Sequence, residues 1–196
     1  MKTLPSIPKP CKEEVKFYLK KNESSKKYDD QTKAVSKIFK NCARENKTIE
    51  DILIKVSCVN QFDSTNIFDI HTVANHILHL NIDERLASGD LDLVKDMGHV
   101  ILKDKPKYFY SFATKYCAHH SSEVYPIYDS YVSKILVHFK REYQFAEFKV
   151  DDLRDYQIFN DTIEAFIKFF GLNEYKKSEI DRYIWLLGKK HYPNNY

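Results

Sequence analysis

The segment from Tyr125 to Leu136 reads YPIYDSYVSKIL, and it predicts a turn followed by a helix. From Val132 to Phe139, apolar residues recur at the i, i+3, i+4, i+7 spacing of an amphipathic helix. Asp129 follows the turn residue Pro126 and takes the N-cap position, where backbone N–H groups of the first turn can bind its side chain. Such bonds fix the carboxylate in place and favour its ionised form at neutral pH. The placement suits a structural cap and a catalytic carboxylate equally.

Other segments carry the same helical signature. Thr48 is followed three residues later by Asp51, a pattern similar to the capping box at a helix start. The helix predicted after it is apolar on most of its faces, as is typical of a helix at the centre of a bundle. Gly171 is expected to close a later helix, and Ser178 with Asp181 to start the last one. No alternating apolar run typical of a strand is present. Further helices are predicted near residues 28–42, 67–80, 83–100 (two short ones), 108–120, 129–142 and 159–170. The sequence therefore predicts an all-α fold, a compact multi-helix bundle of about nine helices.

Length and composition indicate an ordinary globular chain. With 196 residues, of which 43% are hydrophobic and 30% charged, it is most simply one domain that buries about 70% of its unfolded surface. Only 4 Gly and 6 Pro stand against 14 Tyr and 13 Phe, which favours long helices with aromatic packing. We expect an N-terminal arm with one short helix over residues 1–27 and a single all-α domain over residues 28–196.

Charge and targeting signals narrow the function classes. The net charge of +3 is mild, so nucleic-acid binding would need a local basic face. No apolar stretch has membrane-spanning length, and the start, Met1 to Pro5, lacks the apolar core of a signal peptide. The expected location is the cytoplasm, with no membrane partner. The four cysteines are scattered, which argues against a disulfide framework or a structural zinc site.

The pattern Pro-Ile-x-Asp-x-x-Val-x-Lys-Ile-Leu, from Pro126 to Leu136, resembles the catalytic aspartate segment of the helix-hairpin-helix DNA glycosylase superfamily, above all its adenine glycosylase and endonuclease III relatives. A helical segment with Ala113 precedes it, as in that family. A second stretch, from Val59 to Asn66, resembles the family's base-pocket segment. The resemblance covers residues from about Thr48 to Leu136. It implies a glycosylase-like fold with two helical lobes and a cleft between them.

The chain departs from the family in three places. Bifunctional members carry a Schiff-base lysine two residues before the alanine, where this chain has Ser111, 18 residues before Asp129. The family's hairpin has a Gly-x-Gly turn that binds a DNA phosphate, but Lys107 to Tyr110 stand here, and side chains keep a phosphate from the backbone. The scattered cysteines exclude the iron–sulfur cluster of many relatives. A divergent member without the lyase reaction is therefore expected.

For such a member the resemblance implies a monofunctional N-glycosylase, which removes a base and leaves an abasic site uncut. Asp129 would stabilise the positive, oxocarbenium-like sugar of the transition state while water attacks. The base would be extruded from duplex DNA that carries a damaged or mismatched base. No cofactor and no metal are expected. The expected substrate-binding residues are Asn60, Gln61, Ser111, Lys115, Tyr128 and His120.

Two other interpretations remain open at this point. The fold could persist without the reaction, as a nucleic-acid or protein binding module, which the absent lysine, the absent hairpin glycines and the low net charge favour. Alternatively, the chain is a helical interaction protein in which Asp129 is only a cap.

Overall fold

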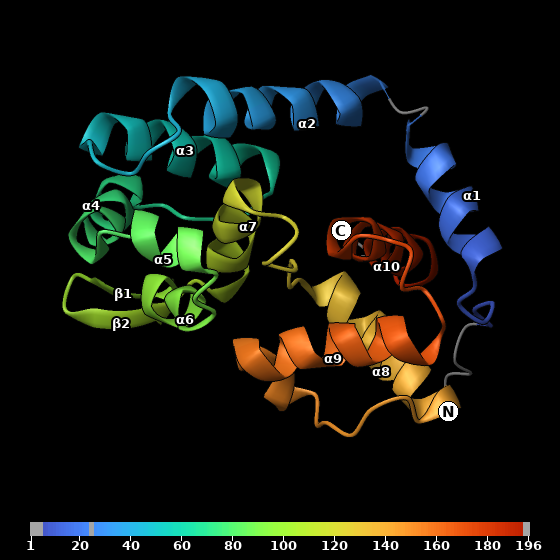
Figure 1. Ribbon diagram of the computed structural model, residues 1–196. Helices are drawn as coiled ribbons and strands as arrows, with labels where there is room; N and C mark the ends of the chain where they lie inside the picture. The colour runs from blue at the N-terminus through green and yellow to red at the C-terminus, as the bar shows by residue number, and fades with distance from the viewer. Residues whose placement is uncertain (1–5, 24–25, 194–196) are drawn as a thin grey trace.

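The computed structural model describes residues 6–23 and 26–193, and in this part of the chain it is almost entirely helical (Figure 1). Its elements, in chain order, are α1 (Lys12–Glu23), α2 (Lys26–Lys37), the π-helix η1 (Ile38–Cys42), α3 (Ile49–Phe62), α4 (Ile70–Leu80), α5 (Asp83–Ser88), α6 (Asp92–Gly98), β1 (His99–Leu102), β2 (Lys105–Tyr108), α7 (Tyr110–His120), α8 (Ser130–Tyr143), the 3-10 helix η2 (Asp151–Arg154), α9 (Tyr156–Phe169) and α10 (Lys177–His191). The all-α prediction is confirmed, with ten α-helices among the described residues instead of about nine. Residues 1–5 and 24–25 of the expected arm lie outside the described residues.

The helices are arranged in two groups (Figure 1). Helices α2 to α7 and the hairpin form one group, in which α3 packs on α4 and α6 packs on α7. The other group holds α8, α9 and α10, and α1 from the start of the chain packs on α10. Contacts between α6 and α9 join the groups, and their buried side chains form one hydrophobic cluster from Ile7 to Leu187. The link from α7 to α8 passes between the groups and carries Asp129.

The hairpin corrects the prediction of helix up to residue 100. Strands β1 and β2 pair antiparallel from His99 opposite Tyr108 to Leu102 opposite Lys105. The turn residues Lys103 and Asp104 have φ angles of 48° and 62°, the left-handed conformation that a two-residue hairpin turn needs. This turn usually contains asparagine or glycine, and β2 has no apolar alternation, so the sequence carried no hairpin signal.

Two of the predicted helix ends are correct and one start is wrong. Thr48 caps α3 by accepting a bond from the Asp51 backbone N–H at 3.3 Å. Gly171, with a φ of 66°, directly follows Phe170, the C-cap residue of α9. The last helix begins at Lys177, where the Glu179 side chain binds the backbone N–H of Lys176 at 2.8 Å. Asp181 therefore lies inside α10, and it is buried.

Gly188 allows α10 to approach α8 closely, and its replacement by alanine is expected to destabilise the protein by about 2 kcal/mol. A Cβ atom there would lie 2.5 Å from the Cβ of Tyr131 and 2.9 Å from its backbone oxygen. Because this neighbour is largely backbone, it cannot move aside as a flexible side chain would. Urea unfolding followed by circular dichroism measures the loss.

The matched control is Gly171→Ala, where a Cβ meets nothing within 4 Å and only the positive φ is strained. That change should cost about 1 kcal/mol. A Gly188→Ala protein as stable as the native one would show that the helices do not pack as described.

Candidate functional site

Asp129 caps α8, as the sequence predicted. Its Oδ1 atom accepts bonds from the backbone N–H groups of Tyr131 at 2.9 Å and Val132 at 2.8 Å. Its Oδ2 atom makes no hydrogen bond to any described residue. One oxygen of the carboxyl therefore fixes the group, and the other is free to act on a ligand.

The turn before Asp129 is held by side chains from three helices. Tyr156 on α9 donates its hydroxyl to the backbone oxygen of Pro126 at 2.9 Å. Asp181 on α10 accepts a bond from the backbone N–H of Ile127 at 2.6 Å. Thr114 on α7 accepts from the backbone N–H of Tyr128 at 3.2 Å. Both helix groups thus hold this backbone in place, and with it the position of Asp129.

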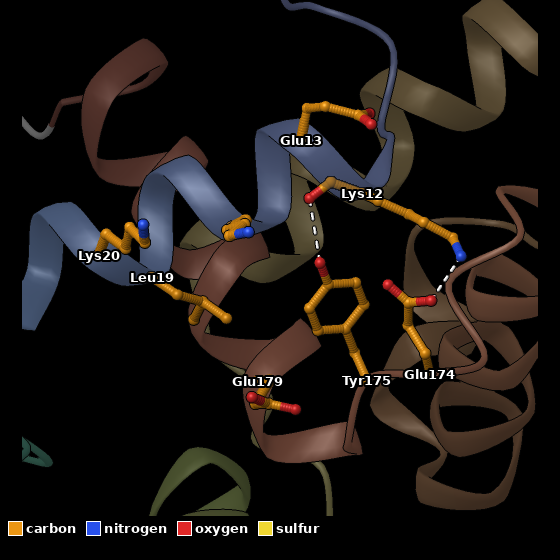
Figure 2. Close-up of a pocket in the computed structure, with 8 residues that line it drawn as sticks. Lys12, Glu13, Leu19, Lys20, Glu174, Tyr175 and Glu179 are labelled. Carbon is orange, nitrogen blue, oxygen red and sulfur yellow. Dashed lines mark hydrogen bonds and ion pairs between the residues drawn. The ribbon is translucent and has the colours of Figure 1, made fainter.

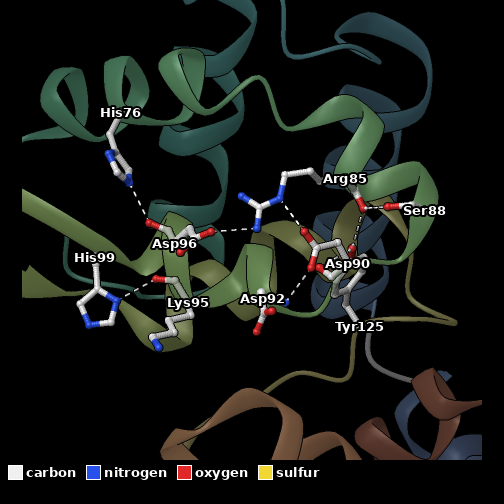
Figure 3. A network of polar contacts seen from close by, with 9 residues as sticks. All are labelled: His76, Arg85, Ser88, Asp90, Asp92, Lys95, Asp96, His99 and Tyr125. Carbon is white, nitrogen blue, oxygen red and sulfur yellow. Dashed lines mark hydrogen bonds and ion pairs between the residues drawn. The ribbon is translucent and has the colours of Figure 1, made fainter.

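The start of the same turn is anchored on the α5–α6 connection (Figure 3). The hydroxyl of Tyr125 lies 3.3 Å from the backbone oxygen of Arg85 and 3.2 Å from that of Asp90. The Arg85 guanidinium binds the Asp90 carboxylate at 2.6 Å and the Asp96 carboxylate at 2.8 Å, which rigidifies the connection. Tyr125 is fully buried, so the start of the turn is held in one position.

The electrostatics of Asp129 differ from the expectation of a stabilised anion. Burial raises the pKa of Asp129, and this effect outweighs the opposing backbone N–H bonds and the positive charges of Lys115 and Lys134. Burial raises the pKa of Asp181 still more, to well above its ordinary value, and the Asp129 charge adds to the rise. The N–H bonds of the helix cap act to lower the pKa of Asp129, but burial raises it by more, so the net pKa lies above its ordinary value.

The face of α7 beside Asp129 carries polar side chains. Lys115 donates to the backbone oxygen of Asp63 at 2.9 Å, and His119 binds the Asp63 carboxylate at 2.7 Å. Ser111 is half-buried one turn before Lys115, and its backbone oxygen accepts the Thr114 hydroxyl at 3.0 Å. Of the predicted residues, Lys115 lies close enough to Asp129 for its charge to lower the pKa of that carboxyl, and Ser111 lies one turn before Lys115 on the same helix.

His120 belongs to a polar network with the buried residues Asn46, Lys55 and Tyr116. Its Nε2 atom is 3.3 Å from the Asn46 side chain, which also binds the Asp83 carboxylate at 2.6 Å. The Lys55 ammonium and the Tyr116 hydroxyl both donate to Asn46 Oδ1, at 2.5 Å and 2.6 Å. Burial lowers the pKa of His120 to about 3, aided by the Lys55 charge. We therefore expect the His120 imidazole to be neutral and to act as a structural part of this network.

Lys55 is fully buried, and burial lowers its pKa to about 8. The folded protein then releases this proton at lower pH than the unfolded chain, so stability should rise with pH between about 8 and 10.5. The gain from this one group is about 3 kcal/mol. In Lys55→Met, which cannot titrate, this rise should be missing.

Urea unfolding of both proteins at intervals from pH 7 to pH 10.5 measures the difference. The control is Lys95→Met, which removes an exposed lysine and should leave the pH dependence of the native protein intact. If the free energy of unfolding changes with pH in the same way in the native protein and in Lys55→Met, Lys55 is not a buried cation with a lowered pKa.

The side chains of the remaining predicted residues, Asn60, Gln61 and Tyr128, make no hydrogen bond to Asp129. The Asn60 amide closes the loop after α3, because it accepts the backbone N–H of Ile67 at 2.7 Å and donates to the Ile67 oxygen at 2.9 Å. Gln61 is exposed. The Tyr128 ring packs against Phe159 at 5.4 Å between centroids. Their roles in substrate binding remain predictions.

Two hollows of the surface lie elsewhere. One, of about 550 Å³, lies between α1 and α10, where Tyr175 donates to the backbone oxygen of Lys12 at 3.0 Å and Lys12 pairs with Glu174 (Figure 2). The other, of about 170 Å³, lies between α6, the hairpin and α9, and is lined by the stacked rings of His99 and Tyr108. Neither is lined by Asp129.

Comparison with known proteins places the chain in a family. The model of the HI_0787_N N-terminal domain matches residues 14–124. This chain belongs to the HI_0787_N family. It is 45% identical over 148 residues to an uncharacterized protein of Haemophilus influenzae, across 75% of this chain and 71% of that protein. No solved structure matches.

The region matched by the HI_0787_N model includes Lys115 and the Asn46 network, and it ends just before Tyr125. Asp129 and its turn follow it directly. Among the described residues, no helix is both long enough and apolar enough to cross a membrane.

Sequence reasoning missed the three residues that hold the Asp129 turn. The sequence places Asp181 at a helix start, although its position within an apolar helical stripe is a signal of burial. Thr114 and Tyr156 gave no signal, because a threonine or tyrosine on a helical face usually packs or faces solvent. All three residues act through contacts with residues far apart in the chain, which local sequence patterns do not show.

Proposed function

We propose that this protein is a monofunctional DNA N-glycosylase that releases a damaged or mismatched base, with Asp129 as its catalytic carboxylate. The observation that supports it most is the arrangement of Asp129. The carboxyl is fixed through Oδ1 and through the bound turn before it, while Oδ2 is uncommitted. The reaction would take place in the cytoplasm.

The chemistry requires a negative charge at a fixed position. Cleavage of an N-glycosidic bond develops positive charge on the sugar, and a preorganised carboxylate stabilises that charge as it forms. A partly buried carboxylate does so more strongly than an exposed one, since water screens it less. The raised pKa of Asp129 is consistent with such an environment.

The residue at position 111 supports a reaction without strand cleavage. A Schiff-base mechanism needs an amine that can reach the sugar, and the side chain of Ser111 offers a hydroxyl. Lys115, one turn later, holds its ammonium at 2.9 Å from the backbone oxygen of Asp63. Water is therefore the proposed nucleophile.

An exposed aromatic residue supports the proposed action on duplex DNA. Phe68 lies in the loop between α3 and α4, directly after Ile67, which binds Asn60, and the residue is 98% exposed. The loop holds Ser64 and Asn66 at positive φ angles of 52° and 57°. An apolar ring on a defined loop can insert between base pairs and take the place of an extruded base. The same loop begins at Asp63, which contacts Lys115.

A second candidate function is a nucleic-acid or protein binding module without catalysis. One observation favours it: the two hollows described above do not include Asp129, and base excision needs a pocket that accepts a base. In this alternative Asp129 is only the cap of α8.

Base release from a panel of labelled duplexes tests the proposal. The duplexes carry uracil, oxidised guanine, alkylated adenine or an adenine mismatch, and each is analysed with and without alkali. A monofunctional enzyme gives cut strands only after alkali, and borohydride traps no covalent complex. Cut strands without alkali would contradict the assignment of water as the nucleophile. Binding to duplexes without any base release would favour the binding module.

A further inference from the structure

Asp181 is a buried carboxyl group that has no role in the reaction proposed above. It lies on α10 with 6% of its surface exposed. Its Oδ2 atom accepts the backbone N–H of Ile127 at 2.6 Å, two residues before Asp129. Its Oδ1 atom is buried and has no hydrogen-bond partner in the described part of the chain. A carboxylate would leave that oxygen with an unsatisfied charge.

The groups around Asp181 do not supply a free cation. Lys177, on the same helix, binds the Asn160 side chain at 2.9 Å and the Glu164 carboxylate at 2.6 Å. From α9 comes Tyr156, whose hydroxyl donates to the backbone oxygen of Pro126. From the start of α8 comes a second acid, Asp129, whose charge opposes ionisation of Asp181. No cation among the described residues forms an ion pair with Asp181.

A buried carboxylate without a counter-ion is strongly disfavoured, and such a group takes up a proton instead. Two carboxyl groups that interact also resist joint ionisation. The direction of the pKa shift at Asp181, well upward, agrees with these arguments. The protonated form keeps an acceptor oxygen for the N–H of Ile127.

We propose that Asp181 is a positioning residue for Asp129: a buried, protonated carboxyl that fixes the turn before Asp129 without placing a second negative charge beside it. Its effect on the reaction rests on the proposed function of Asp129. Its effect on the turn does not, and can be measured separately.

Two substitutions separate the effect of the Ile127–Asp181 hydrogen bond from the effect of a charge at position 181. Asp181→Asn keeps an acceptor for Ile127 and is neutral, so it imitates the protonated acid. Asp181→Ala removes the acceptor and leaves the Ile127 N–H unsatisfied. Hydrogen exchange of the Ile127 amide should be about 10 to 100 times faster in Asp181→Ala and within about threefold of native in Asp181→Asn. Equal exchange in all three proteins would overturn the positioning role.

The protonation state is tested by urea unfolding between pH 4 and pH 7. The pKa of Asp181 is higher in the folded protein than in the unfolded chain, so the native protein loses stability as pH rises above about 4. Asp181→Asn has no such loss. Its urea midpoint should match that of the native protein at pH 4 and exceed it increasingly toward pH 7. A difference that stays constant with pH would show an ordinary, ionised aspartate and overturn the proposal.

Excision kinetics supply the third readout. Asp181→Asn should retain kcat within about threefold, whereas Asp181→Ala should lose about 100-fold through misplacement of Asp129. The acidic limb of the kcat/KM profile should have the same midpoint in Asp181→Asn and native protein, because neither carries a charge at position 181. A lower midpoint in Asp181→Asn would reveal an ionised Asp181. If the native protein releases no base, the proposed function fails, but exchange and unfolding still decide the role of Asp181.

Discussion

Asp129→Asn is expected to lower the rate of base excision about 1,000-fold while the protein stays folded. Asparagine is as good an N-cap as aspartate, and its side-chain oxygen can accept the same bonds from Tyr131 and Val132. What it lacks is the negative charge that, in the proposed reaction, stabilises the developing positive charge on the sugar. Single-turnover kinetics with excess enzyme isolate that step from product release.

The chain offers a matched control for this substitution. Asp155 caps α9 by accepting the backbone N–H of Ile158 at 3.2 Å, and it is exposed. Asp155→Asn makes the same chemical change at another helix start, so it should leave excision unchanged. Equal losses in the two variants would indicate a structural effect, and a loss below tenfold in Asp129→Asn would remove Asp129 from the chemistry.

Asn46→Ala is expected to destabilise the protein by about 4 kcal/mol. The Asn46 side chain accepts bonds from the buried groups Lys55 and Tyr116 and donates to Asp83. Without it, the Lys55 ammonium keeps only the backbone oxygen of Glu45, and the Tyr116 hydroxyl keeps no described partner. A buried cation that loses its partners is among the most destabilising changes in a core.

Urea unfolding at pH 7 measures this loss, with Asn60→Ala as the control. Asn60 also makes three side-chain bonds, but these join it to neutral groups of one loop. Its removal should cost about 1 to 2 kcal/mol. If Asn46→Ala costs no more than Asn60→Ala, the buried network is not a significant source of stability.

Local patterns in the sequence predicted most of the helices. The stripe after Thr48 and the cap at Asp129 depend on neighbours within four residues, so they can be recognised without knowledge of the fold. The hairpin from His99 to Tyr108 could not be recognised, since its turn residues Lys103 and Asp104 take left-handed angles that their residue types seldom adopt. Tertiary packing imposes that conformation.

The candidate site was predictable only in part. The sequence predicted Asp129 as the cap of α8 and placed Ser111 and Lys115 on the preceding helix, α7. The sequence does not predict the core network of Lys55 and His120, because a lysine is expected at the surface. Their burial depends on Asn46 and Asp83, which join them through long-range contacts. The same applies to Asp181, whose partner Ile127 lies 54 residues away.

The decisive measurement is release of the free base from the lesion-bearing duplexes, followed in parallel for the native protein and Asp129→Asn. We expect the native protein to release the base from at least one duplex and to leave an uncut abasic strand, while Asp129→Asn at equal folded concentration releases about 1,000 times less. Equal release by the two proteins, or no release from any duplex by a folded native protein, would contradict this expectation.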